Sequence, residues 1–364
     1  MVQLLTLAVA AAALACGNAT DGSPQRLEAW RPLSAASVTG DGEGGVVARV
    51  NATGELLHWG MDGRLRHRCP GGDPLLQGER GPVVARGTKV LALFLNHPAG
   101  DEEARQAAVV DLRKCRVTAT FSLPGLTLQG AGLDSGWALV TGPNPPAAGS
   151  PRVWVVDERG REVLTFDLEE AMSTLAEKVD LPPGTSPRGF FLVAAGKELW
   201  LLPHARYELW RPPQRGKPLR VVNPPPCLTA TARILTGEEN VAYVTAFASK
   251  LSEPHRSAIL EGIARGGLKP SFRAAVTAAS TYRDTLAVVV RSPATGAGDR
   301  LDLWDLTSER VLASLPFPAD VTLVSLGEGF AWVRDGEGRI GRWPLPEVSP
   351  ADEFRCPDNA PPPG

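Results

Sequence analysis

Residues Arg152–Leu168 read RVWVVDERGREVLTFDL, which is two apolar runs separated by a short polar segment. Val153–Val156 forms the first run, Val163–Phe166 forms the second, and Glu158–Arg161 lies between them. Runs of this length that are rich in valine and aromatic residues are typical of β-strands. The polar segment contains Gly160, which suits a tight turn. This stretch therefore predicts a β-hairpin.

The same hairpin pattern recurs along the chain. Clear copies are LDLWDLTSERVLASL at Leu301–Leu315, LLHWGMDGRLRH at Leu56–His67 and FAWVRDGEGRIGRWPL at Phe330–Leu345. Less regular copies are AAVVDLRKCRVTATFSL from Ala107, YELWRPPQRGKPLRVV from Tyr207 and AILEGIARGGLKPSF from Ala258. Leading apolar runs begin near Val46, Val90, Trp137, Phe190, Val241, Leu286 and Phe330, at spacings of 44, 47, 53, 51, 45 and 44 residues. A period of roughly 40–50 residues is typical of four-stranded propeller blades.

The pattern resembles the β-propeller superfamily in the broad sense, including the YVTN, NHL and WD repeat families. The steps Trp304-Asp305 and Val155-Val156-Asp157 are similar to the strand-ending residues of those repeats, and the likeness covers roughly residues 40–346. The sequence lacks the Gly-His element and regular Trp-Asp of true WD repeats, so it points to no particular member. We expect an all-β propeller over residues 25–346. The spacing favours seven four-stranded blades, or six if the first or last copy is part of a closing blade.

Two further elements complete the expected ring. Leu168–Asp180 reads LEEAMSTLAEKVD and places its apolar residues on one helical face, which predicts a short helix inserted between two blades. Leu27–Trp30 could supply the strand that closes the last blade. Beyond the ring, residues 347–364 form a proline-rich tail.

Recurrent residues have structural explanations. Tryptophan precedes the short turn at Trp59, Trp154, Trp210 and Trp304, where a large side chain would fill the space between neighbouring blades. A basic residue follows the turn at Arg64, Arg161, Lys217, Arg310 and Arg339. Positive charge on an exposed hairpin protects a sheet edge from pairing with another chain.

The first residues predict export. The residues of Leu4–Ala15 are small and apolar except for Thr6. This stretch is too short to cross a bilayer and suits the core of a signal peptide. Ala13-Leu14-Ala15 permits a cut before Cys16, and this arrangement resembles a bacterial lipoprotein signal in which Cys16 carries the lipid. A second cut site follows Ala19. We expect residues 1–19 to be a signal peptide and the mature protein to be periplasmic, anchored to the outer membrane or extracellular. A buried N-terminal helix is the alternative.

The cysteines agree with export. Four remain besides Cys16, namely Cys69, Cys115, Cys227 and Cys356, and they allow two disulfides in three pairings. Buried free thiols are the alternative. No CxxC pair occurs in the sequence, which excludes a zinc ribbon.

The sequence contains no recognisable catalytic, cofactor or metal motif. None of its histidines, His58, His67, His97, His204 and His255, shows the spacing of a helical metal site, and His58 and His67 are better explained as surface or blade-packing residues. The glycine-rich stretches Gly40–Gly45 and Asp335–Gly338 are expected to be turns. We therefore expect no catalytic residue and no cofactor, although channel residues drawn from separate blades would leave no motif.

The charge composition limits the classes of binding partner that we expect. Lys and Arg number 38 against 40 Asp and Glu and are well mixed along the chain, which argues against nucleic acid and anionic membranes. The leading hypothesis is a non-catalytic cell-envelope propeller that binds a protein, peptide or glycan, with membrane contact only through the N-terminal lipid. The alternative is a propeller enzyme with a channel metal, of a lactonase or lyase type.

Overall fold

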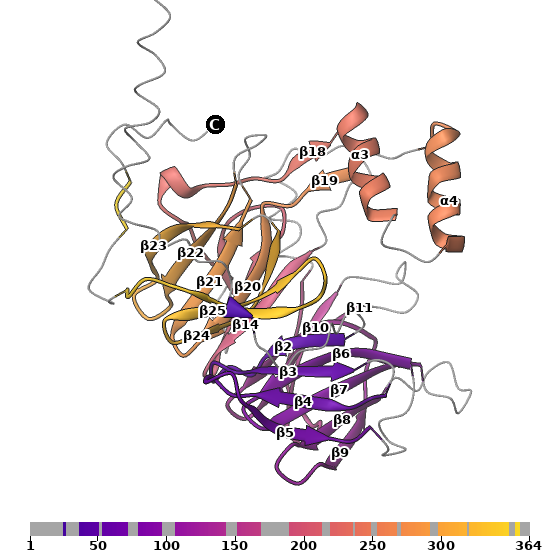
Figure 1. Ribbon diagram of the computed structural model, residues 1–364. Coiled ribbons are helices and arrows are strands. Elements are labelled where there is room, and N and C mark those ends of the chain that lie inside the picture. Colours follow the sequence, from indigo (N-terminus) through magenta and orange to yellow (C-terminus); the bar gives the residue numbers. More distant parts are fainter. Residues whose placement is uncertain are drawn as a thin grey trace, which may run out of the picture.

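The computed structural model describes residues 25–26, 36–50, 53–71, 79–96, 106–142, 151–168, 189–212, 219–235, 237–248, 253–267, 271–291, 298–318, 320–348 and 354–356. Within these residues the chain forms six four-stranded antiparallel sheets (Figure 1). The first strands of successive sheets contact one another in order, and that of the last sheet contacts that of the first. The sheets are therefore the blades of a closed ring.

The blades are numbered from the N-terminus. Blade 1 contains β2 (Ala36–Gly40), β3 (Val46–Val50), β4 (Leu56–Trp59) and β5 (Leu65–Cys69). Blade 2 contains β6 (Glu79–Arg86), β7 (Lys89–Asn96), β8 (Gln106–Asp111) and β9 (Arg116–Ser122). Blade 3 contains β10 (Leu126–Leu133), β11 (Gly136–Gly142), β12 (Arg152–Asp157) and β13 (Glu162–Asp167).

The remaining blades complete the ring. Blade 4 contains β14 (Phe190–Ala195), β15 (Glu198–Pro203), β16 (Leu209–Arg211) and β17 (Arg220–Val222). Blade 5 contains β20 (Val276–Tyr282), β21 (Thr285–Val290), β22 (Asp299–Asp305) and β23 (Arg310–Phe317). Blade 6 contains β24 (Val321–Gly327), β25 (Phe330–Asp335), β26 (Ile340–Pro344) and the N-terminal β1 (Gln25–Arg26).

The ring closes by joining the two ends of the chain. Gln25 pairs with Arg342 and Arg26 pairs with Gly341, so β1 is the outer strand of blade 6. The closing strand thus lies directly before the segment Leu27–Trp30, which is outside the described residues. Closure by one strand from the N-terminus ties the first and last parts of the sequence into one sheet.

The preference for seven blades is wrong, and the described residues form six. The seventh was counted from a leading run near Val241 and a copy from Ala258, but both begin in helices. Between blades 4 and 5 the chain forms η3 (Pro226–Leu228) and then an insertion made of β18 (Arg233–Leu235), α3 (Gly237–Ala248), α4 (Glu253–Ala264) and β19 (Ser271–Arg273). This insertion occupies about one repeat length, which made the spacing look regular.

The insertion is a helical hairpin on a two-stranded stem. β18 pairs with β19, and α3 and α4 project from the ring at the upper right (Figure 1). Glu238 and Glu239 lie in the first turn of α3, where negative charge is favourable near the helix N-terminus. This local preference favours a helix at the position where the leading run near Val241 predicted a strand. The helix expected over Leu168–Asp180 lies outside the described residues apart from Leu168, which is buried.

The turns between third and fourth strands share one backbone design. In blades 1, 2, 3 and 5 the strand register shifts beside the turn, as in a β-bulge. A residue near the end of each turn has a positive φ, and these residues are Gly63 (77°), Cys115 (48°), Gly160 (79°) and Glu309 (57°). A turn with this combination is a common way to connect a β-hairpin.

The same turn position links neighbouring blades. Cys115 is disulfide-bonded to Cys69 of the preceding blade. Glu309 forms ion pairs with Arg220 and with Arg211, the latter at 3.7 Å, and both arginines belong to blade 4. One backbone position therefore supplies a covalent link in one place and an ionic link in another.

The tryptophan prediction is confirmed. Trp59, Trp154, Trp210 and Trp304 all lie in the third strand of a blade and are at most 9% exposed. Of the basic residues after the turns, Arg161 pairs with Asp157 at 2.6 Å, within its own turn.

The described cysteines form two disulfides. Cys69 pairs with Cys115 and Cys227 with Cys356, with Cα atoms 5.0 and 5.8 Å apart, which is one of the three pairings that the sequence allowed. The second disulfide holds the tail on the ring, where the Phe354 backbone N–H donates to the Val311 carbonyl at 3.0 Å. Within the described part of the chain, no helix has the length and apolar character needed to cross a bilayer.

Candidate functional site: the central channel and its surroundings

The first strands of all six blades line a cavity of about 120 Å³ at the centre of the ring. Its lining side chains are small or apolar. They include Gly40 and Thr39 from β2, Gly130 from β10, and Ser280 and Thr281 from β20. The cavity is thus the central channel that the ring creates.

Glycine keeps this channel narrow. A Cβ added at Gly40 would strike the Ser325 hydroxyl of blade 6, and one at Gly132 would approach the Ala85 carbonyl of blade 2 to 2.7 Å. The first strands of neighbouring blades therefore lie closer than ordinary side chains allow. Glycine in a strand interior often marks such close approach of two backbones.

The hydroxyl groups of the inner strands connect blades to one another. Thr281 Oγ1 donates to the Ala194 carbonyl at 2.6 Å, and Ser325 Oγ donates to the Gly45 carbonyl at 3.2 Å. Among the described residues that line the cavity, none carries a carboxylate or an imidazole. The described part of the chain likewise contains no group of three or more His, Cys, Asp or Glu arranged for a metal ion. These lining side chains can pack against a ligand or hydrogen-bond to it, but they cannot exchange a proton near neutral pH.

A polar chain of three residues lies in blade 1. His58 Nε2 is 2.9 Å from Asp41 Oδ2, and His58 Nδ1 is 3.1 Å from His67 Nδ1. Asp41 and His58 are 3% and 5% exposed, whereas His67 is half-buried. The other oxygen of Asp41 accepts hydrogen bonds from the backbone N–H groups of Glu43 and Gly45.

This contact between two imidazoles accommodates one proton. The rings are 7° from parallel with their centroids 5.3 Å apart, and one nitrogen must donate while the other accepts. Burial lowers the pKa of His67, and His58, Arg113 and Arg66 act in the same direction while Asp111 opposes them. Protons on both Nδ1 atoms would set two N–H donors against each other.

We expect the protein to lose stability as the pH falls below about 6.5, the ordinary pKa of histidine. The folded-state pKa of His67 lies below that value, so the unfolded chain binds the proton more readily and acid favours unfolding. The stabilisation is therefore complete above the unfolded pKa and is lost on acidification. Urea midpoints at pH 7.5 and 5.5 measure the effect, and His67→Gln should reduce the difference. An equal pH dependence in that variant would show that His67 is not responsible.

A second buried network joins blades 4 and 5. Trp304 Nε1 donates to the Tyr207 hydroxyl at 2.6 Å. The fully buried Asp302 accepts from Ser314 Oγ at 2.6 Å and from Arg300 Nε at 3.1 Å. Burial raises the pKa of Asp302, while Arg300 and Ser314 oppose that rise. These residues are not among those that line the channel, and the Trp304–Tyr207 hydrogen bond connects two neighbouring blades.

The structure places the remaining histidines apart from these groups. His204 packs its ring against Phe191 with centroids 4.3 Å apart, and burial lowers its pKa. His97 lies outside the described residues, as does Cys16, and the side chain of His255 is not described. The stretches Gly40–Gly45 and Asp335–Gly338 connect consecutive strands, as expected, although Gly40 and Asp335 are the last residues of β2 and β25. Sequence reasoning identified His58 and His67 as neighbours of one hairpin but missed Asp41, since no spacing connects it to them.

Comparisons with known proteins add the following. No family model and no curated protein matches this chain. The β-propeller domain of Cps50 (Swd1) from Myceliophteria thermophila is 9% identical, with a TM-score of 0.44, and the match covers 89% of this chain and 100% of that one. The β-propeller domain of the Trilobed protease from Pyrococcus furiosus is 9% identical, with a TM-score of 0.40, and the match covers 88% and 84% of the two chains.

The fold assignment rests on the architecture described above. Six four-stranded antiparallel blades surround one channel, and a strand from the N-terminus completes the last blade. The described part of the chain therefore has a six-bladed β-propeller fold.

Proposed function

We propose that this protein is an exported, non-catalytic β-propeller that binds a protein, peptide or glycan through one face of its ring. The observation that carries this proposal is the unequal length of the connections on the two faces. Adjacent strands are antiparallel, so connections after first and third strands leave one face and those after second and fourth strands leave the other. Binding residues on such scaffolds are commonly carried by loops.

The first face carries short turns. Connections after first strands span residues 41–45, 87–88, 134–135, 196–197, 283–284 and 328–329. The longest connection on this face spans residues 212–219. On the opposite face the chain takes residues 168–189 to pass from blade 3 to blade 4 and residues 223–275 to pass from blade 4 to blade 5. We call this second face the long-loop face.

The helical hairpin belongs to the long-loop face and exposes apolar side chains. Val241 and Tyr243 on α3 are 40% and 45% exposed, and Leu260 on α4 is 40% exposed. Large apolar side chains exposed together are common where another molecule binds. We place the partner contact on this hairpin.

The proposal includes export. Two disulfides are in keeping with an oxidising compartment, where such bonds persist. Residues 1–19 would then be the export signal, with Cys16 as the lipid attachment site or a residue removed with that signal. Mapping the N-terminus of the native protein tests this, and an intact Met1 would contradict it.

The binding claim is tested by cross-linking in the native envelope fraction. In the variant, residues 237–267 are replaced by a short glycine-serine linker between β18 and β19, which already pair with each other. Lys197→Glu with Arg159→Glu is the matched control, because both residues lie in short turns on the other face. We expect the wild type and the control to capture the same partner and the hairpin-deleted protein to lose it. Equal capture by the hairpin-deleted protein would contradict the proposal, as would a stoichiometric divalent ion in the channel.

A further inference from the structure

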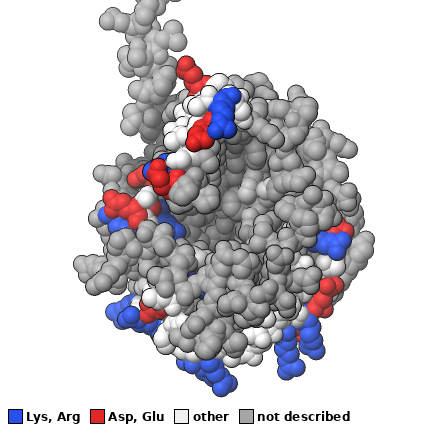
Figure 2. Space-filling model, turned by 90° about the vertical axis from the view of Figure 1, so that its right-hand side faces the viewer, with Lys and Arg blue, Asp and Glu red and all other residues white. Residues whose placement is uncertain are grey.

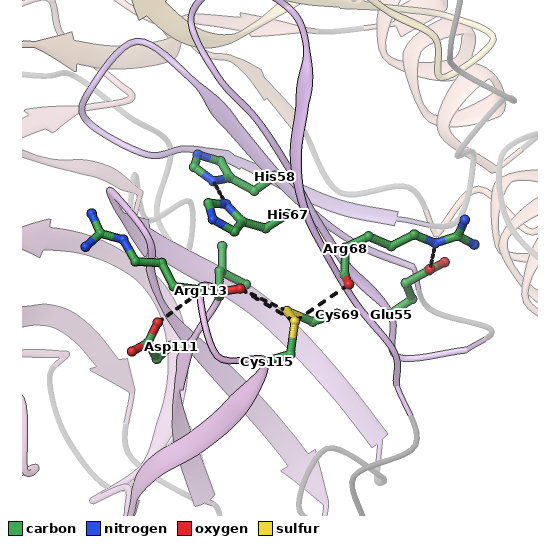
Figure 3. The surroundings of a disulfide bond; sticks show 9 residues. Glu55, His58, His67, Arg68, Cys69, Asp111, Arg113 and Cys115 are labelled. Carbon is green, nitrogen blue, oxygen red and sulfur yellow. Dashed lines mark hydrogen bonds and ion pairs between the residues drawn. A yellow bond between two sulfur atoms is a disulfide. The ribbon is translucent and has the colours of Figure 1, made fainter.

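Six basic residues gather on the outer edge of blades 1 and 2. Three come from the hairpin that contains β5 and three from the turn before β9 and its first residue, and we call them the cationic rim: Arg64, Arg66, Arg68, Arg113, Lys114 and Arg116. The two segments are about fifty residues apart in the sequence. The disulfide between Cys69 and Cys115 joins them, with Arg68 and Arg113 on either side of it (Figure 3).

The rim keeps an excess of positive charge. Asp62 pairs with Arg66 at 2.7 Å and with Arg64 at 3.9 Å, and Glu55 pairs with Arg68 at 2.5 Å, so these two carboxylates neutralise most of the charge on the hairpin that contains β5. The three cations of the second segment, Arg113, Lys114 and Arg116, are exposed and form no ion pair with any residue that the structure describes. Lys and Arg side chains also project along the lower edge of the molecule in Figure 2, and blades 1 and 2 form the lower part of Figure 1.

The geometry of the rim suits a long anionic molecule. Five of its six residues are arginines, whose planar guanidinium groups bind carboxylate, sulfate or phosphate groups through paired hydrogen bonds. Residues two apart on a strand are separated by about 6.6–6.8 Å, so Arg66 and Arg68 lie in a row on one face of β5, each beside its carboxylate partner. The disulfide fixes the turn that carries Arg113 and Lys114 to the end of β5.

Two other anionic partners fit less well. Single-stranded nucleic acid usually stacks its bases on aromatic side chains, and residues 60–69 and 112–116 offer only the half-buried His67. A membrane surface usually takes up several apolar side chains, and Leu65, 46% exposed, is the large apolar side chain that β5 exposes. The cationic rim offers charges without aromatic side chains for stacking or several apolar side chains for membrane insertion, which favours a hydrated anionic polymer as its ligand.

We propose that the cationic rim binds an acidic polysaccharide. The recognised chemistry is a row of carboxylate or sulfate groups on a linear glycan. This surface lies on the outer strands of blades 1 and 2, so it is separate from the hairpin on which we place the partner contact. Simple protection of a sheet edge also calls for positive charge, and the experiment below distinguishes the two roles.

The test measures binding of fluorescent polygalacturonate and heparin fragments to the full chain between 50 and 200 mM salt. The variant is Arg113→Ser, Lys114→Ser, Arg116→Ser, which removes the three unpaired cations and no buried group. The control is Arg152→Ser, Arg159→Ser, Lys197→Ser, which removes the same charge from exposed positions in blade 3 and in the turn between β14 and β15 of blade 4. A single-stranded oligonucleotide and polyglutamate serve as anionic polymers without sugar acid groups.

We expect the wild type and the control to bind at least one glycan and the rim variant to bind it at least tenfold more weakly at 50 mM salt. If each lost contact releases about 0.7 of a counterion, as for single-stranded nucleic acid, the slope of log affinity against log salt should fall by about two. Equal binding by the rim variant would overturn the proposal and leave edge protection as the explanation. Tighter binding of the oligonucleotide or polyglutamate than of either glycan would overturn the choice of partner.

Discussion

Replacing Cys69 and Cys115 together by serine should lower the free energy of unfolding by about 2–4 kcal/mol, the usual contribution of a disulfide. The bond joins residues 46 apart in the sequence and connects the outer strand of blade 1 to the turn of blade 2. Without it, the unfolded chain gains conformational freedom and two neighbouring blades lose their covalent link. Urea denaturation at pH 7.5 without reductant measures the loss.

Reduced wild-type protein provides the control for this variant. Reductant should destabilise the wild type by at least as much as the double substitution, because it also breaks the bond between Cys227 and Cys356. A loss below about 0.5 kcal/mol, the size of an ordinary surface substitution, would show that the bond does not stabilise the ring.

Replacing Asp302 by alanine should lower the free energy of unfolding by about 3–5 kcal/mol, as expected when one partner of a buried ion pair is removed. Asp302 is fully buried, and the side chain of Arg300 that faces it is 20% exposed. The variant leaves that guanidinium group without its carboxylate in the interface between blades 4 and 5. Chemical denaturation followed by tryptophan fluorescence measures the change, because Trp304 lies in the same network.

Ser314→Ala is the matched control for Asp302→Ala. It removes one hydrogen bond to the same carboxylate but keeps the charge pair. Its cost should be about 1 kcal/mol, the net contribution of a typical hydrogen bond. If both variants destabilise the protein equally, the charge pair contributes nothing beyond that hydrogen bond.

The blade count shows where periodicity is informative and where it misleads. A hairpin such as Arg152–Leu168 specifies its own strands, since apolar runs and a turn glycine lie next to each other in the sequence. Spacing alone does not reveal what fills an interval. The helical hairpin between blades 4 and 5 has the length of a blade, so a count from spacing returned one blade too many.

The candidate sites show the same division. The sequence indicated that no compact catalytic motif exists, but it could not show that glycine and small residues from six separate blades meet around one narrow channel. Asp41 and His58 are neighbours only because β2 and β4 belong to one sheet. The well-mixed charges of the chain argued against any basic surface, yet folding brings Arg66 and Lys114 to the same edge.

By itself, the sequence determined the repeated hairpins, the buried tryptophans of the third strands and the number of disulfides that the described cysteines can form. These features depend on residues that are close together in the chain or on simple composition. Only the tertiary structure decided the number of blades, the disulfide pairing, the channel lining and the cationic rim. Each of these depends on which distant segments become neighbours when the ring closes, and closure is set by packing between blades rather than by any local pattern.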